Sequence, residues 1–266
     1  MSGLPDPVVK HRADAPHGFF AVESAGLHWL AQARSRGGAS VALPVQPVSP
    51  GDTRIAIARV TTHPATPAAA ERFGRELAAT HRAGAPWFGC PPQGWDGDGF
   101  IGPIPLPHNT VDRNIGWGRF FARYRLEPFL RQAVDHRTLP EQGRRAVSVL
   151  CERLADEDPD LCGPAEPVAR LHGDLWSGNV LWDGASAVLI DPSAHGGHRE
   201  SDLAMLALFG LPHLDRVLAA YHEAWPLAEG WRERVGLHQL FPLLVHTVLF
   251  GSSYGAQAAA AAAHYV

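Results

Sequence analysis

The feature that most constrains this chain is a polar segment, Leu171–Asn179, with the sequence LHGDLWSGN. Apolar runs flank it: Val168–Leu171 comes before it and Val180–Asp191 after it, and both have the composition of strands. The second run ends on a carboxylate, Asp191. We therefore expect two strands around a tight turn, a β-hairpin that carries a cluster of polar side chains.

The spacing of these polar residues fits a kinase catalytic loop, H-R-D-L-x-x-x-N followed by a metal-binding Asp on a second strand. Phosphoryl transfer needs an aligned hydroxyl and neutralised phosphate charge. The pattern predicts that Asp174 accepts the proton of the hydroxyl and that Asn179 and Asp191 hold Mg²⁺ through oxygen. His172 is expected to brace the loop. The alternative is a plain turn capped by Asp174 and Asn179, which needs neither His172 nor Asp191.

A kinase also needs a strand lysine for the nucleotide phosphates, paired with a helix glutamate. Lys10 is the only lysine in the chain, and Glu23 lies in the first predicted helix. We predict that they pair; the alternative is a solvated lysine and an ordinary surface glutamate. No glycine-rich loop precedes Lys10, where Gly3 is the only glycine. We expect either a start further upstream or a nucleotide held without that flap.

The fold class expected from these patterns is α+β, with a small α/β part followed by a larger, mainly helical part. Strands are expected at 41–48 and 55–60, and 87–114 is expected to be an ordered loop without regular structure. The Thr/Pro-rich segment 61–67 divides the chain into domains 1–61 and 62–266. Helical periodicity predicts helices over 19–33, 67–83, 115–135, 140–156, 200–209, 214–225, 230–250 and 256–264.

At these residues the sequence resembles the fructosamine kinase (ketosamine 3-kinase) family, a branch of the aminoglycoside-phosphotransferase-like kinases. HGDL with a later Asn is shared by the whole superfamily, whereas the WSGN that follows it is the more specific tag. The resemblance extends from about Lys10 to Tyr254. Its further matches are Gly18–Leu27, Phe73–His81, Phe100–Asn109, Trp117–Leu126, Gly197–Ala204 and Leu249–Gly251.

The resemblance implies a two-lobed protein-kinase-like fold. Because so few residues precede Lys10, we expect a truncated N-lobe, followed by a mainly helical C-lobe that holds the catalytic loop and the substrate site. It implies ATP and Mg²⁺ as cosubstrates and a ketoamine, a sugar joined to an amine, as acceptor. Phosphorylation of a fructosamine makes the adduct labile and frees the amine, which is deglycation. By the same resemblance Asp202 would brace the catalytic loop. The hinge that meets adenine would lie in Ile57–Thr61, through Ile57, Ala58, Arg59 and Val60.

Four residues are candidates for the substrate pocket. Trp176 lies two residues past Asp174, so its ring either stacks on a sugar or packs beneath the loop. Trp117, Arg125 and His195 are weaker candidates, and Arg125 could equally be a helix-surface or ion-pair residue.

Composition excludes several other classes of protein. The formal net charge of −4 argues against a nucleic-acid partner. Leu240–Phe250 is the most apolar late stretch, but it is too short to span a bilayer, so no membrane partner is expected. Met1–Lys10 lacks the apolar region of a secretory signal, and three cysteines without metal-ligand spacing suit a reducing cytoplasm. We expect a cytoplasmic protein; its oligomeric state is not indicated.

Three functions stay open. The first is ATP-dependent phosphorylation of a ketoamine of fructosamine or ribulosamine type, with a glycated amine as partner. The second is a kinase for another small alcohol, such as an aminoglycoside or amino sugar, which would favour a broad acidic groove. The third is a catalytically silent nucleotide-binding module. The missing glycine loop favours the third function, and the intact Asp174, Asn179 and Asp191 oppose it.

Overall fold

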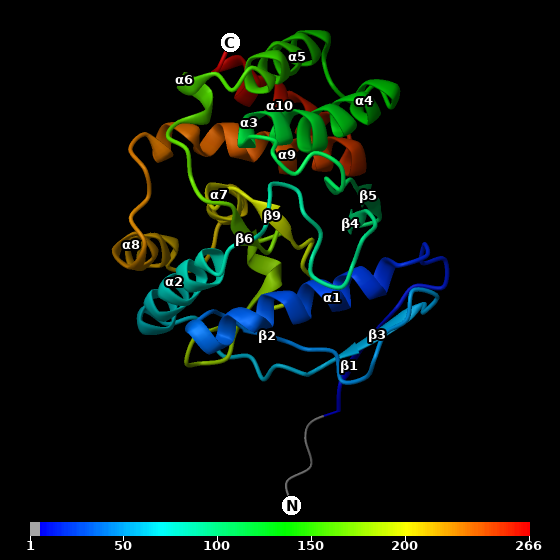
Figure 1. Ribbon diagram of the computed structural model, residues 1–266, viewed down its shortest axis with the longest axis vertical. Coiled ribbons are helices and arrows are strands. Elements are labelled where there is room, and N and C mark those ends of the chain that lie inside the picture. The colour runs from blue at the N-terminus through cyan, green and yellow to red at the C-terminus, as the bar shows by residue number, and fades with distance from the viewer. Residues whose placement is uncertain (1–5) are drawn as a thin grey trace, which may run out of the picture.

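The first part of the chain forms a small sheet covered by one helix (Figure 1). The computed structural model describes residues 6–266, so Gly3 lies outside the described residues. β1 (Val8–His11) pairs antiparallel with β3 (Arg54–Ile57), and α1 (Phe19–Ala31) packs on the pair. Because successive strand side chains alternate between faces, Lys10 is less exposed than Val9 and lies on the side of α1.

A second sheet joins an early strand of the chain to the two strands that follow the polar segment. β2 (Ser40–Val41) runs parallel to β8 (Ala187–Leu189), which pairs antiparallel with β7 (Val180–Trp182). The predicted strand 41–48 is therefore wrong in length, because Pro44 and Pro47 have no N–H to donate to a ladder. Since β2 pairs with β8, the sheet crosses the predicted boundary at residue 61, and the division into 1–61 and 62–266 stays a prediction.

The hairpin around the polar segment is formed differently from the prediction. β6 (Ala169–Leu171) pairs with β9 (His195–Gly197), not with the strand that follows the turn. The hairpin is β7–β8, which lies within the single run predicted as one strand. The turn at Asp183 breaks that run because its carboxylate accepts the backbone N–H groups of Ala185 and Ser186. The polar segment thus links two different sheets.

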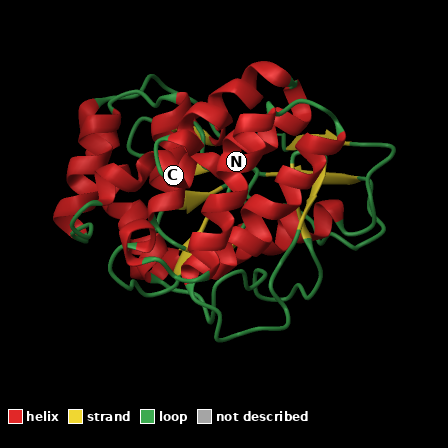
Figure 2. Ribbon diagram, turned by 90° about the horizontal axis from the view of Figure 1, so that it is seen from above, coloured by secondary structure: helices red, strands yellow, loops and turns green. Residues whose placement is uncertain are grey.

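The predicted helices are all present, and short strands lie among them (Figure 2). The prediction of no regular structure over 87–114 is wrong, since β4 (Gly99–Ile101) and β5 (Ile104–Leu106) form a hairpin there. No helix among residues 6–266 is long and apolar enough to cross a membrane. The remaining helices are α2 (Pro67–Arg82), α3 (Trp117–Phe120), a π-helical turn (Phe121–Leu126), α4 (Glu127–Asp135), α5 (Glu141–Ala155), α6 (Pro159–Cys162), α7 (Glu200–Phe209), α8 (Leu214–Ala224), α9 (Trp231–Phe250) and α10 (Ser252–Ala263), with 3₁₀ turns at Gln32–Arg36 and Ser177–Asn179.

The largest apolar core lies among the later helices, where α9 packs against α4, α7 and α10. A second core joins α2 and α8 to the β7–β8 hairpin. The polar segment Leu171–Asn179 begins at a buried strand residue and returns to one, Val180. Both of its ends are therefore anchored in apolar packing.

Candidate active site

The loop after β6 is shaped by glycine and by a short 3₁₀ turn. Gly173 has φ +81°, and a Cβ there would lie 2.1 Å from the carbonyl oxygen of Ser193, so only glycine fits. The turn Ser177–Asn179 brings the Asn179 amide back to Asp174. Asn179 Nδ2 donates to the Asp174 carbonyl at 2.8 Å and to the Asp174 carboxylate at 3.2 Å. The five-residue spacing between Asp174 and Asn179 in the sequence is therefore the length of the loop that these hydrogen bonds close.

Asp174 has no cationic partner among the described residues. Burial raises its pKa to about 7, against the lowering effect of the hydrogen bond from Asn179, and Asp191 adds to the rise. A carboxylate with a pKa near the working pH is suited to exchange a proton with a substrate. The arrangement can therefore accept a proton from a hydroxyl that enters the cleft.

Asp202 holds the start of the loop from below. Its carboxylate accepts the backbone N–H of His172 at 2.8 Å and that of Gly173 at 2.9 Å. His81 Nε2 lies 3.1 Å from the same carboxylate, and Tyr221 hydrogen bonds to the other ring nitrogen of His81. Burial alone would raise the pKa of Asp202, but these partners lower it. The buried carboxylate is thus fully paired.

His172 ties the loop to the end of β8. Its Nε2 donates to the carbonyl of Ile190 at 2.8 Å, and its Nδ1 accepts the N–H of Asp174 at 3.3 Å. Burial lowers the pKa of His172, so the ring is neutral at pH 7. These hydrogen bonds hold Asp174 in place relative to the end of β8, where Asp191 follows.

Lys10 lies between two carboxylates. Its Nζ pairs with Glu23 of α1 and lies 2.7 Å from Oδ1 of Asp191. Burial raises the pKa of Glu23, while the charge of Lys10 lowers it. Asp191 adopts φ 54°, a left-handed conformation at the end of the strand. The structure therefore brings together three residues that are far apart in sequence.

These residues line one cleft with a volume of about 410 Å³. The Asp191 side chain is 42% exposed, and Asn179 uses its amide nitrogen toward Asp174. Oδ1 of Asp191 is paired with Lys10, which leaves Oδ2 of Asp191 and Oδ1 of Asn179 for a hard cation such as Mg²⁺, so the donor set fits that metal. The cleft is lined by Lys10, His11, Arg12, Phe19, Phe20, Val22, Glu23, Phe100, Gly102, Asp174, Trp176, Asn179, Asp191, Pro192 and Ser193.

Comparison with known proteins agrees with this geometry. The family model described as Fructosamine kinase matches residues 7–266. The chain belongs to the fructosamine kinase family. A protein of Enterococcus faecium named "Probable ketoamine kinase" is 36% identical over 183 residues, which are 68% of this chain and 61% of that relative. The chain spans between 45% and 61% of the length of the first four curated relatives that it matches.

Solved structures support both the family and the fold. A crystal structure of a candidate fructosamine-3-kinase from Thermobifida fusca has a TM-score of 0.82 and 47% identity, covering 96% of this chain and 84% of that one. An aminoglycoside phosphotransferase with ADP and hygromycin B has a TM-score of 0.58 and 16% identity, covering 92% and 83%. The second likeness shows the fold alone. The predicted resemblance and the α+β kinase-like fold class are confirmed.

In this member of the fructosamine kinase family, Trp176 lies in the cleft and is not a core residue. It is 41% exposed. Its ring covers Gly178, where a Cβ would lie 2.3 Å from the ring, and its edge meets Phe209 with ring centroids 6.3 Å apart. The glycine of the WSGN tag therefore allows the Trp176 ring to lie flat over the loop.

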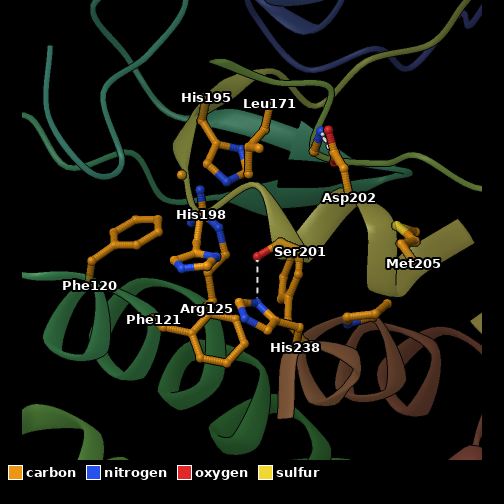
Figure 3. Close-up of a pocket in the computed structure, with 14 residues that line it drawn as sticks. Phe120, Phe121, Arg125, Leu171, His195, His198, Ser201, Asp202, Met205 and His238 are labelled. Atoms are coloured by element: carbon orange, nitrogen blue, oxygen red, sulfur yellow. Dashed lines mark hydrogen bonds between the residues drawn. The ribbon is translucent and has the colours of Figure 1, made fainter. Parts of the chain in front are cut away.

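The other three substrate candidates do not line the cleft. Trp117, Arg125 and His195 are all buried, at 6%, 1% and 4% exposure. Arg125 and His195 border an internal cavity of about 20 Å³, which is room for one water molecule (Figure 3). Residues of α3, α7 and α9 also border this cavity, and none of the three candidates is among the residues that line the cleft.

Arg125 is buried rather than on a helix surface, and it forms no ion pair with any residue that the structure describes. It donates to the carbonyls of Pro107 and Tyr124 at 2.8 and 2.9 Å, and its guanidinium lies 4.8 Å from the ring centre of Phe120. Burial lowers its pKa to about 9. The two carbonyls both accept from Nη1, an aromatic face lies against the guanidinium, and Nε and Nη2 have no hydrogen-bond partner among the described residues.

The proposed hinge residues also lie outside the cleft lining. Ile57 is buried in β3, the Ala58 N–H donates to Leu43, and Arg59 donates to the carbonyl of Asp6. No residue of 57–60 is among those that line the cleft. Their contact with adenine stays a prediction.

Several cleft residues were not predicted. Ser193 donates to the carbonyl of Phe100 at 2.7 Å, which attaches the β4–β5 hairpin to the strand after Asp191. Phe100 lies 5.0 Å from Phe19 between ring centroids. Phe100 lies in Phe100–Asn109, a segment that resembles the family, and this resemblance could have indicated that Phe100 belongs to the site. His81, the buried partner of Asp202, lies in another matched segment, Phe73–His81.

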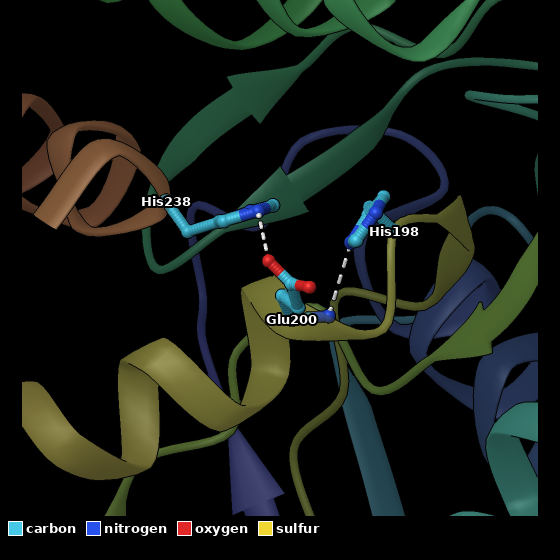
Figure 4. A group of neighbouring side chains, drawn as sticks. All are labelled: His198, Glu200 and His238. Atoms are coloured by element: carbon cyan, nitrogen blue, oxygen red, sulfur yellow. Dashed lines mark hydrogen bonds and ion pairs between the residues drawn. The ribbon is translucent and has the colours of Figure 1, made fainter. Parts of the chain in front are cut away.

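One cluster resembles a metal site but is an ion-pair network. His198, Glu200 and His238 lie close together and are buried (Figure 4). Both carboxylate oxygens of Glu200 accept from Arg234, at 2.9 and 2.6 Å, and His238 lies 3.3 Å away. Although burial raises the pKa of Glu200, His238 and Arg234 lower it to about 2. The guanidinium therefore occupies the position that a cation would need.

Proposed function

We propose that this protein phosphorylates a sugar hydroxyl of a ketoamine with ATP and Mg²⁺, and so acts in deglycation in the cytoplasm. Its partner would be a small ketoamine or a glycated amine, not a nucleic acid or a membrane. The observation that carries the proposal is the position of Asp174, whose carboxyl has a pKa of about 7 and shares a cleft with Lys10 and Asp191. Membership of the fructosamine kinase family supports the ketoamine as acceptor.

Each residue would have one task. Asp174 accepts the hydroxyl proton as the oxygen attacks the terminal phosphate. Lys10, oriented by Glu23 and close to Asp191, would bind the phosphates of the nucleotide. Asp191 and Asn179 would hold Mg²⁺, which when bound supplies positive charge to the phosphates. Asp202 and His172 keep the loop in place for this alignment.

The test is ADP formation from Mg-ATP over a panel of ribulosyl- and fructosyl-amines. We expect turnover with ketoamines by the wild type and loss of turnover in Asp174→Asn. Asp135→Asn is the matched control, because Asp135 is exposed on α4 and lies outside the cleft. No ADP above the Asp174→Asn background with any ketoamine would contradict the proposal. Turnover of aminoglycosides or amino sugars alone would favour the second function, and ATP binding without any turnover would favour a silent module.

A further inference from the structure

A row of aromatic side chains leads away from the cleft. The aromatic strip consists of Trp176, Phe209, His246, Phe250 and Tyr254. Successive ring centroids lie 6.3 Å apart from Trp176 to Phe209 and 4.8 Å apart from Phe209 to His246. His246 lies 5.2 Å from Phe250 and 5.0 Å from Tyr254. The catalytic loop, α7, α9 and α10 thus all contribute to one continuous surface.

The strip is open to solvent at both ends. Phe250 is 64% exposed and Trp176 is 41% exposed, and the three residues between them are partly exposed. Burial lowers the pKa of His246, so its ring is neutral at pH 7. Contiguous exposed aromatic rings on a protein surface mark a binding site more often than isolated apolar residues do.

The strip begins inside the proposed active site. Trp176 lines the cleft together with Asp174, and its ring orientation is fixed by Gly178 and Phe209. The β4–β5 hairpin forms another wall of the cleft and lies close to the strip. Its turn residue Gly102 lines the cleft, and a Cβ there would lie 3.8 Å from Cδ1 of Leu249, the neighbour of Phe250. A ligand that leaves the cleft past Trp176 therefore meets the strip first.

We propose that the aromatic strip binds the amine half of the ketoamine and favours amines that carry an aromatic group. This inference rests on the proposed function. A ketoamine has two ends, and when its sugar hydroxyl is at Asp174 its amine substituent has to leave the cleft. The strip is uncharged and aromatic, so it offers stacking contacts to a flat apolar group. The sugar is bound at Trp176 and the substituent along Phe209, His246, Phe250 and Tyr254.

The experiment compares two acceptors that differ only in the amine. Steady-state kinetics are measured with ribulosyl-phenylalanine and ribulosyl-glycine at saturating Mg-ATP. We expect the wild type to have a lower KM for the phenylalanine adduct, and Phe250→Ser to raise that KM about 3- to 10-fold while leaving the KM for the glycine adduct unchanged. Tyr254→Ser is a second variant with the same expected direction.

Val149→Ser is the matched control, since Val149 is 43% exposed on α5 and outside the strip. Equal KM values of the wild type for both adducts, or an equal rise for both in Phe250→Ser, would overturn the subsite alone. If the strip instead joins two copies of the chain, Phe250→Ser would have a lower molecular mass in solution than the wild type and an unchanged KM. That result would also overturn the subsite. No turnover of either adduct by the wild type would overturn the proposed function itself.

Discussion

Asp174 in the cleft and Glu200 in the interior are both shielded from water, yet their pKa values move in opposite directions. The pKa of Asp174 rises to about 7, and within residues 6–266 its one side-chain hydrogen-bond partner is the neutral amide of Asn179. The pKa of Glu200 falls to about 2, because His238 lies 3.3 Å from its carboxylate and Arg234 donates to both of its oxygens. Burial acts on both carboxylates, and the presence or absence of a cation decides the outcome.

The difference separates two uses of a buried charge. The carboxylate of Glu200 is saturated with donors, so it holds α7 against α9 and has no capacity for further chemistry. Asp174 keeps an incompletely paired carboxylate where a ligand can reach it, and this lowers stability in exchange for a useful pKa. Asp202 resembles Glu200 in this respect, since its donors fix the loop that presents Asp174.

The largest effect is expected from Asp174→Asn. An amide cannot accept the hydroxyl proton, so kcat should fall by about 10²- to 10⁴-fold. Because the amide does not carry the cost of a buried charge, the midpoint of thermal unfolding should stay the same or rise. ADP release and thermal melting, with Asp135→Asn as control, check this. A variant with full activity would remove Asp174 from the mechanism.

Glu200→Ala should have the opposite profile. It leaves the guanidinium of Arg234 buried without its carboxylate, which is expected to lower the free energy of unfolding by about 3–5 kcal/mol. Urea denaturation measures this, and Glu152→Ala on the exposed side of α5 is the control. An unchanged free energy of unfolding would show that the Glu200–Arg234 pair does not stabilise the interior.

A smaller effect is expected from pH. Below the pKa of Asp174, about 7, the base is protonated, so kcat/KM should fall about tenfold per pH unit as the pH drops. The pKa is raised from its ordinary value of 3.8, so the folded state binds more protons than the unfolded state between pH 3.8 and about 7. Stability should therefore decrease as pH rises through this window. A rate profile or stability curve of Asp174→Asn that is identical to that of the wild type would contradict the assignment.

The sequence predicted the chemical centre better than it predicted what surrounds it. The loop residues and Asp191 could be found because a local pattern fixes their spacing, and the Lys10–Glu23 pair followed from one strand and one helix. The pairing of β6 with β9 was missed because both partners are short and non-local. Trp117, Arg125 and His195 lie outside the cleft lining because a local sequence pattern does not show which distant elements pack over a residue, and their contact with a substrate stays a prediction.

The most direct measurement is ³¹P NMR of the product formed from Mg-ATP and a ribulosyl-amine whose sugar is labelled with ¹³C. If the cleft around Asp174 aligns a sugar hydroxyl with the nucleotide, a phosphate monoester signal coupled to a sugar carbon should appear with the wild type and be absent with Asp174→Asn. Inorganic phosphate as the only new signal with the wild type would contradict a ketoamine kinase.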